Sequence, residues 1–154
     1  MTTLFPYTTP DLGAIADLFC GIGTFALPLS SRAKVLAVEG DEAATQALGR
    51  AAKTSGKPIE TEQRDLFTRP YTPAELRGTD AVVLDPPRAG ASAQCEALAA
   101  SEVQRIVYVS CNPDALSRDL RTLRACYDLT ALGLVDQFVW SPHIEAVAVL
   151  ERRS

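Results

Sequence analysis

The stretch 14-AIADLFCGIGTFALPLS-30 decides how this chain folds. Its first residues, Ala14 to Phe19, form an apolar run that is typical of a buried strand. Two glycines follow, Gly21 and Gly23, and the residues from Thr24 to Arg32 have the amphipathic pattern of a helix. A strand that passes through a glycine turn into a helix is the usual first unit of a parallel α/β sheet. Glycines in such a turn let the backbone approach a ligand closely.

The rest of the chain continues this alternation of strands and helices. Further strands are predicted at Lys34–Glu39, Ile59–Arg64, Ala81–Leu84, Arg105–Val109, Leu129–Phe138 and Ala146–Glu151. Further helices are predicted at Asp41–Lys53, Ser92–Ser101 and Asp114–Tyr127. Apolar strands that alternate with helices predict a mostly parallel sheet with helices on both faces, and the two closing strands predict an antiparallel hairpin. The expected fold is a seven-stranded, Rossmann-like α/β domain whose functional loops lie at the carboxyl ends of the strands.

Length and composition predict one globular domain. The chain has 154 residues, of which 47% are hydrophobic and 22% charged. No apolar run is long enough to span a bilayer, and the N-terminus lacks a signal-peptide pattern, so we expect a cytoplasmic protein without a membrane segment. The four cysteines show no metal-ligand spacing with the single histidine, so we expect free thiols and no metal.

The net charge limits how the chain can hold nucleic acid. The formal charge is −4 and the pI is about 5.0. Phosphate contacts dominate nucleic-acid affinity and usually require a basic surface. Any nucleic-acid role therefore depends on a local patch or on another domain.

Acidic residues at strand ends indicate which cofactor the glycine turn serves. Glu39 ends the second strand, where a carboxylate accepts both ribose hydroxyls of an adenine nucleoside. NAD enzymes and S-adenosylmethionine-dependent methyltransferases share this feature. Asp17, four residues before Gly21, suits the ammonium of a methionine moiety better than a pyrophosphate, and no second domain is present to bring a hydride acceptor. In 85-DPPR-88 an arginine, Arg88, stands where amino-directed methyltransferases place an aromatic residue, which disfavours methylation of an exocyclic amine.

A thiol lies at the end of another predicted strand. In 107-VYVSCNPDAL-116, Cys111 is the point at which an apolar strand passes into a helix. A helix N-terminus favours negative charge, and the thiolate is the nucleophilic form of cysteine. Cys111 is therefore a candidate nucleophile, and a packed thiol at the strand end is the alternative.

Four motifs together resemble a known family. DLFCGIGTFALPL, DPPRAGA, VSCNP and SPHIEAVAVL are similar to the catalytic domain of RNA 5-methyluridine methyltransferases, which modify uracil in ribosomal or transfer RNA. The resemblance covers about residues 14–152. It implies a class I methyltransferase fold, S-adenosylmethionine as the cofactor and RNA as the substrate.

The resemblance also implies roles for individual residues. Cys111 matches the nucleophile that adds to carbon 6 of uracil, and Glu145 matches the base that removes the carbon 5 proton. Positions that match the lining of the cofactor or target pocket are Phe19, Gly21, Thr24, Glu39, Asp65 and Asp85. Thr24 stands where many members carry Asn. The alternatives are a hairpin charge for Glu145 and strand-end caps for Asp65 and Asp85. For His143 we expect an orienting hydrogen bond rather than acid–base work.

The chain departs from the family in its length. We expect a short N-terminal segment, 1–13, and a catalytic domain, 14–154, whereas family members carry upstream domains that grip RNA. The RNA substrate is therefore expected to be held by an upstream domain that this chain does not contain. Two alternatives stay open: a methyltransferase for another substrate, with Cys111 structural, and a truncated cofactor-binding module without RNA activity of its own.

Overall fold

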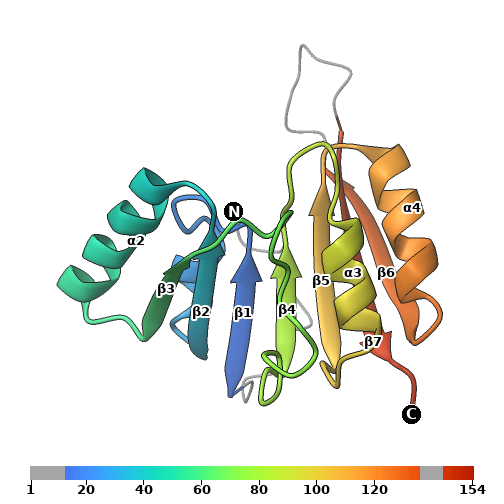
Figure 1. Ribbon diagram of the computed structural model, residues 1–154, viewed down its shortest axis with the longest axis horizontal. Helices are drawn as coiled ribbons and strands as arrows, with labels where there is room; N and C mark the ends of the chain where they lie inside the picture. Colours follow the sequence, from blue (N-terminus) through green and yellow to red (C-terminus); the bar gives the residue numbers. More distant parts are fainter. Residues whose placement is uncertain (1–12, 136–143) are drawn as a thin grey trace.

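The centre of the molecule is a seven-stranded sheet with the strand order β3-β2-β1-β4-β5-β7-β6 (Figure 1). The structure is a computed structural model and describes residues 13–135 and 144–154. The strands are β1 (Ala14–Leu18), β2 (Lys34–Glu39), β3 (Ile59–Gln63), β4 (Ala81–Leu84), β5 (Arg105–Ser110), β6 (Tyr127–Val135) and β7 (Glu145–Arg152).

The pairing of the strands agrees with the sequence pattern. The first five strands pair in parallel, while β7 pairs antiparallel with both β5 and β6. The predicted closing hairpin is therefore confirmed at the level of its two strands. Parallel strands end at the same edge of a sheet, so the loops after β1, β2, β4 and β5 lie together, and the antiparallel β7 begins there.

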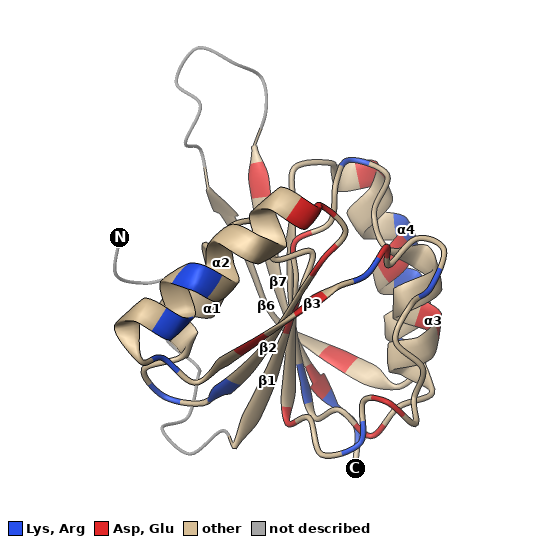
Figure 2. Cartoon of the chain, turned by 60° about the vertical axis from the view of Figure 1, so that its left-hand side comes forward, with Lys and Arg blue, Asp and Glu red and all other residues tan. Residues whose placement is uncertain are grey.

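Helices cover both faces of the sheet (Figure 2). On one face, Phe25, Ala26 and Leu48 pack with the sheet in one apolar cluster. On the other face, Leu98 and Leu116 belong to a second and larger cluster. The helices are α1 (Ala26–Leu29) and α2 (Glu42–Ser55) on the first face, and α3 (Ser92–Ala99) and α4 (Pro113–Leu123) on the second.

Three predicted helices are shorter than expected, and the one predicted at Ser92–Ser101 ends two residues early, at Ala99. The run Thr24–Arg32 contains only the four residues of α1, since Pro28 lacks an N–H and the hydroxyls of Ser30 and Ser31 donate to the carbonyl oxygens of Leu27 and Pro28. The helix predicted at Asp114–Tyr127 is α4, which ends at Leu123.

The burial of Tyr127 explains the early end of α4. Tyr127 is fully buried, and its hydroxyl lies within hydrogen-bond distance of the carbonyl oxygens of Leu98 and Val103, at 3.1 and 2.8 Å. Tertiary packing thus makes Tyr127 the first residue of β6 rather than the last of a helix.

Candidate active site

The turn after β1 is built from backbone conformations that favour glycine. Gly21 and Gly23 have φ angles of 54° and 95°, and Phe19 has a φ of 63°. A Cβ atom at Gly23 would lie 2.5 Å from Cδ1 of Leu48 on α2, whereas a Cβ at Gly21 would meet nothing within 4 Å. The turn is therefore packed against α2 at one glycine and open at the other, where a ligand can approach the backbone.

Glu39, at the end of β2, is held by two backbone amides. Its Oε2 accepts a hydrogen bond from the N–H of Gly21 at 2.9 Å, and its Oε1 accepts one from the N–H of Asp41 at 2.9 Å. These bonds join the glycine turn to the end of the neighbouring strand. Because each carboxylate oxygen can accept more than one hydrogen bond, Glu39 keeps capacity for the hydroxyl groups of a ligand.

Asp17 is a buried carboxylate on β1. It is 0% exposed, and neither of its oxygens has a hydrogen-bond partner among the described residues. The pKa of Asp17 is raised to about 7, chiefly by burial and also by the charges of Asp85 and Glu39, while the Ala26 N–H, which does not reach hydrogen-bond geometry, opposes part of the shift. An unpaired buried carboxylate is costly, so a cationic group at this position would be stabilised strongly.

Asp85 and Glu145 bring two further carboxylates to the same edge. Asp85 follows β4, and its N–H donates to the carbonyl oxygen of Leu18 at 3.3 Å. The pKa of Asp85 is raised to about 6, chiefly by burial and also by the charge of Glu145. Glu145 is the first residue of β7. The start of β7 therefore lies close enough to the end of β4 for their carboxylates to interact.

A cavity of about 280 Å³ connects the ends of these strands. Its lining residues are Phe19, Glu39, Gly40, Asp65, Leu66, Phe67, Asp85, Pro86 and Pro87. The rings of Phe19 and Phe67, whose centroids are 5.4 Å apart, also line a second cavity of about 360 Å³ that extends along 89–94. Four predicted pocket residues, Phe19, Glu39, Asp65 and Asp85, thus share one cavity.

Three predicted pocket residues have a less direct relation to this cavity, and one of them, Gly21, does not line it. Both carboxylate oxygens of Asp65 accept local hydrogen bonds, from the Phe67 N–H at 2.9 Å and the Thr68 hydroxyl at 3.0 Å, and the first of these lowers the pKa of Asp65. Asp65 therefore caps its own turn as well as lining the cavity. Thr24 is exposed and does not line the cavity.

Cys111 lies directly after β5 and is half-buried. The last pair of the β5–β7 ladder joins Ser110 to Ala146, and the register extended by one residue places Cys111 opposite Glu145. Cys20 and Cys95 are buried, and burial raises the pKa of the Cys20 thiol to about 12. Cys20 also follows a strand at this edge, near Asp17 and Glu39, so Cys111 differs from it in being half-buried and in following β5, beside the start of β7.

Asn112 ties the Cys111 loop to the loop after β4. Its side-chain amide donates to the carbonyl oxygen of Arg88 at 2.8 Å. Its Oδ1 accepts from the N–H of Asp114 at 3.1 Å and caps the N-terminus of α4. The loop that carries Cys111 and the loop that carries Asp85 are therefore held together by one side chain, which the sequence interpretation did not identify.

Asp119 fixes the other end of the loop after β4. Its Oδ2 accepts from the N–H of Ala91 at 2.7 Å and from the hydroxyl of Tyr108 at 2.6 Å. A Cβ atom at Gly90 would lie 2.6 Å from the same oxygen. Asp119 is 1% exposed. The sequence carried a signal for this role, because Asp119 lies three residues after Leu116 and four before Leu123, on the apolar face of the helix.

One residue with a predicted role, His143, lies outside the residues that the structure describes.

Two features are absent from the described residues. Across residues 13–135 and 144–154, no helix is long and apolar enough to cross a membrane. In the same ranges, no group of three or more His, Cys, Asp or Glu side chains is arranged to hold a metal ion.

Comparison with known proteins adds to this geometry. A family profile described as tRNA (Uracil-5-)-methyltransferase matches residues 75–153. This range includes the loop after β4, Cys111 and Glu145.

Two curated relatives match nearly the whole chain. An uncharacterised RNA methyltransferase of Agrobacterium fabrum is 57% identical over 141 residues, covering 90% of this chain and 34% of the relative. A 23S rRNA (uracil(1939)-C(5))-methyltransferase of Polynucleobacter necessarius is 40% identical over 151 residues, covering 90% of this chain and 32% of the relative. The chain therefore spans about a third of the length of the curated relatives it matches.

A solved structure shares the fold. The tRNA (uracil-54, C5)-methyltransferase of Pyrococcus abyssi, solved in complex with S-adenosyl-L-homocysteine, superposes with a TM-score of 0.80 and 32% identity. The superposition covers 91% of this chain and 34% of the other. The predicted Rossmann-like class I methyltransferase fold is thus confirmed.

Proposed function

This chain belongs to the tRNA (uracil-5-)-methyltransferase family, and we propose that it transfers a methyl group from S-adenosylmethionine to carbon 5 of a uridine in RNA. The observation that carries the proposal is the Ser110–Ala146 pair at the end of the β5–β7 ladder, because the same register extended by one residue would set Cys111 opposite Glu145, whose charge acts on Asp85 in the cavity wall. A nucleophile and a base at one edge of the sheet are the groups this chemistry requires. We propose that residues 14–154 form the catalytic domain.

The residues present fit the cofactor. Asp17, whose two oxygens lack partners among the described residues, would hold the ammonium of the methionine moiety. Glu39, oriented by the amides of Gly21 and Asp41, would accept the ribose hydroxyls. The open side of the turn at Gly21 lets the backbone approach the same ligand. The bound cofactor supplies the methyl group as an electrophile.

Cys111 and Glu145 would act on the base in succession. Carbon 5 of uracil is a weak nucleophile, so the Cys111 thiolate first adds to carbon 6 and the electron pair of the ring double bond moves to the carbon 5 enolate. Carbon 5 then takes the methyl group. Glu145 removes the carbon 5 proton, the ring double bond forms again and the thiolate leaves. The base would have to lie outside its helical stack to be reached.

The loop after β4 would provide a rigid wall for the target base. Pro86 and Pro87 fix its backbone and line the cavity next to Asp85. Asn112 and Asp119 tie the same loop to the start and the buried face of α4. This loop therefore holds its position relative to Cys111 without help from a ligand.

The grip on RNA would come from another part of a longer polypeptide. The formal charge of −4 disfavours tight RNA binding by this chain alone. Relatives about three times as long have room for an RNA-binding domain upstream. Ribosomal and transfer RNA are both candidate substrates, because the two named relatives with a stated target act on one of each.

Two measurements test the proposal. Calorimetry with S-adenosylhomocysteine tests the cofactor site. Incubation with total RNA and tritiated S-adenosylmethionine, followed by nuclease digestion, tests the reaction. A chimera should be tested beside the isolated chain, with this chain replacing the matching region of the A. fabrum relative. The expected product is labelled 5-methyluridine. Label in another nucleoside or in a small molecule, or no transfer by either protein, would contradict the proposal.

A further inference from the structure

One edge of the sheet exposes a row of leucines. The edge strand β6 carries Leu129, Leu132 and Leu134, which are 36%, 58% and 71% exposed. We call these three residues the β6 leucine face. Ile144, just before β7, is 41% exposed. Large apolar side chains that cluster in this way on a surface mark an interaction site more often than isolated ones do.

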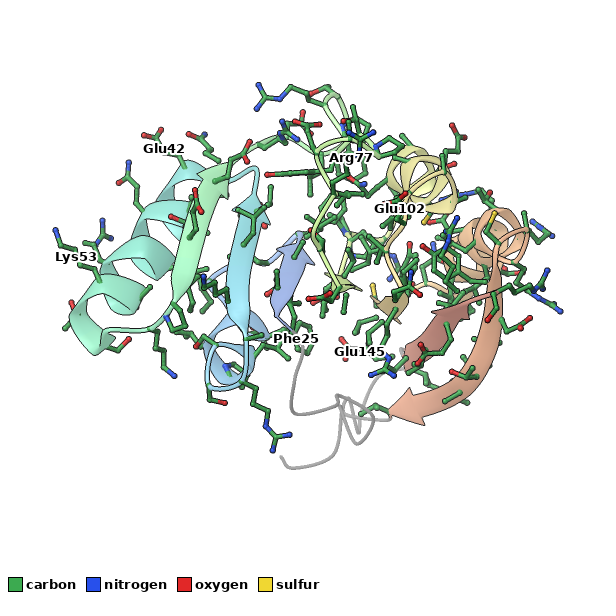
Figure 3. All side chains as sticks on the ribbon, turned by 90° about the horizontal axis from the view of Figure 1, so that it is seen from below. Phe25, Glu42, Lys53, Arg77, Glu102 and Glu145 are labelled. Atoms are coloured by element: carbon green, nitrogen blue, oxygen red, sulfur yellow. The ribbon has the colours of Figure 1, made fainter. Side chains whose placement is uncertain are left out.

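The β6 leucine face continues the apolar core beyond the edge of α4. Its three leucines pair with Leu150, Ala148 and Ala146 of β7, as Leu129 with Leu150, Leu132 with Ala148 and Leu134 with Ala146. These β7 residues are buried in the cluster that contains Leu116 and Leu123 of α4. β6 curves away from α4 toward its end (Figure 3). Among residues 13–135 and 144–154, the face that α4 covers over β7 is therefore uncovered over β6.

The opposite edge of the sheet is built differently. β3 is a five-residue strand that carries Glu60 and Glu62. Charged side chains on a short edge strand prevent association with other proteins. β6 has nine residues and one charged side chain, Asp128, which pairs with Arg153 at 2.7 Å. The sequence thus protects one edge and leaves the other apolar.

We propose that the β6 leucine face is the docking surface for the remaining polypeptide of the longer family members, whether it is joined to a chain like this one or supplied separately. The relatives contain about twice as much additional chain as the part matched here, which is ample to cover the face. Val135 at the end of β6 pairs with Glu145, so a domain seated on this face borders the candidate base. The proposal rests on family membership and not on the chemistry of Cys111.

Two other occupants fit the surface less well. RNA requires cations, and β6 contains no Lys or Arg. A second copy pairing strand to strand would need a regular edge, and the register of β6 shifts between Leu129 and Ala131. The bulge favours a partner that packs on the face over one that extends the sheet.

Hydroxyl-radical footprinting tests the docking surface in the isolated chain and in the A. fabrum chimera, first without RNA or cofactor and then with RNA added. We expect oxidation of Leu132 and Leu134 to fall several-fold in the chimera, while Ile59 on the β3 edge reacts equally in both. Equal reactivity of the leucines in both proteins would overturn the proposal. Protection that appears only with RNA, or that grows with the concentration of the isolated chain, would overturn it in favour of RNA or of a second copy. A Cys111→Ala chimera should give the same footprint, so failure here is separate from failure of the proposed reaction.

Substitution gives an independent test of the same surface. Leu132→Glu combined with Leu134→Glu should leave the Tm of the isolated chain almost unchanged, because both side chains are exposed. The same pair should lower the Tm of the chimera by several degrees, since it places two carboxylates in an apolar interface. The matched control is Ala51→Glu on the exposed side of α2, which should affect neither protein. Equal effects of the leucine pair on both proteins would contradict docking.

Discussion

Ser110 and Ala146 form the last pair of the ladder between β5 and β7. Extended by one residue, this register sets Cys111, which follows β5, opposite Glu145, the first residue of β7, at the carboxyl edge of the sheet. Two segments more than thirty residues apart in sequence thereby meet at this edge. The antiparallel strand β7 is essential to this arrangement, because its first residue, not its last, lies at the active edge.

Asn112 should affect the reaction through the position of the loops. Asn112→Ser keeps a capping side chain for α4 but cannot reach the Arg88 carbonyl oxygen. We expect the Tm to change little and the rate of methyl transfer to fall roughly tenfold, the scale of one lost hydrogen bond. Asn112→Ala should lose the cap as well and destabilise the chain by about 1 kcal/mol. An unchanged transfer rate in Asn112→Ser would show that the tie to Arg88 does not position the site.

Asp17 should make the ligand-free chain less stable at higher pH. Its pKa is raised from 3.8 to about 7, so the folded chain binds this proton more tightly than the unfolded chain does. The contribution of Asp17 to the free energy of unfolding therefore falls as the pH rises from 3.8 to about 7. Asp17→Asn should remove this part of the decline and stabilise the chain at about pH 8 by roughly 1–4 kcal/mol.

Urea denaturation at about pH 5 and about pH 8 measures this effect. Glu60→Gln, an exposed carboxylate on β3, is the control and should retain the full pH dependence. If Asp17→Asn behaved like the control, the carboxylate of Asp17 would not carry the cost of burial.

Glu39 should contribute to cofactor affinity. Glu39→Ala should weaken S-adenosylhomocysteine binding by roughly 1–3 kcal/mol, the scale of charge-assisted hydrogen bonds to hydroxyls. Glu42→Ala, at an exposed position in the first turn of α2, is the matched control and should bind normally. Calorimetry measures both, together with NAD, which should not bind. Tight NAD binding, or equal affinity of the two variants, would argue against this cofactor site.

RNA binding by the isolated chain should depend only weakly on salt. With a formal charge of −4, the chain is expected to engage few phosphates, and each engaged phosphate of a single strand adds about −0.7 to the slope of log K against log salt. The chimera should show a steeper slope. Filter binding at several salt concentrations measures both slopes. A steep slope in the isolated chain would contradict the proposal that another part of a longer polypeptide holds the RNA.

The fold was predictable because its signals are local. Apolar runs, the glycines at 21 and 23, and the Asp41 cap of α2, which accepts from the Ala44 N–H at 2.7 Å, all act within a few residues. The predicted end of the first helix was wrong for a local reason, the missing N–H of Pro28, whereas the predicted helix end at Tyr127 was wrong because longer-range packing decided the outcome. Sequence periodicity does not report which partner a side chain meets across the fold.

The site was predictable in part for the same reason. Strand ends predicted that Glu39, Asp85 and Cys111 lie at one edge, because parallel strands end there, and the roles of these residues stay predictions. The roles of Asn112 and Asp119 depend on loops brought together in three dimensions. The role of Asp119 was easier to predict from the sequence than that of Asn112, since a carboxylate on an apolar helix face requires a partner.

Trapping of a covalent complex tests the central claim most directly. Cys111→Ala, Glu145→Gln and the unmodified sequence, each in the A. fabrum chimera, are incubated with substrate RNA and S-adenosylmethionine and separated by denaturing electrophoresis. Glu145→Gln should accumulate a protein–RNA species, because the thiolate cannot leave until the carbon 5 proton is removed, and Cys111→Ala should form none. Normal turnover by Cys111→Ala, or an inactive Glu145→Gln without a trapped species, would contradict the assignment of nucleophile and base.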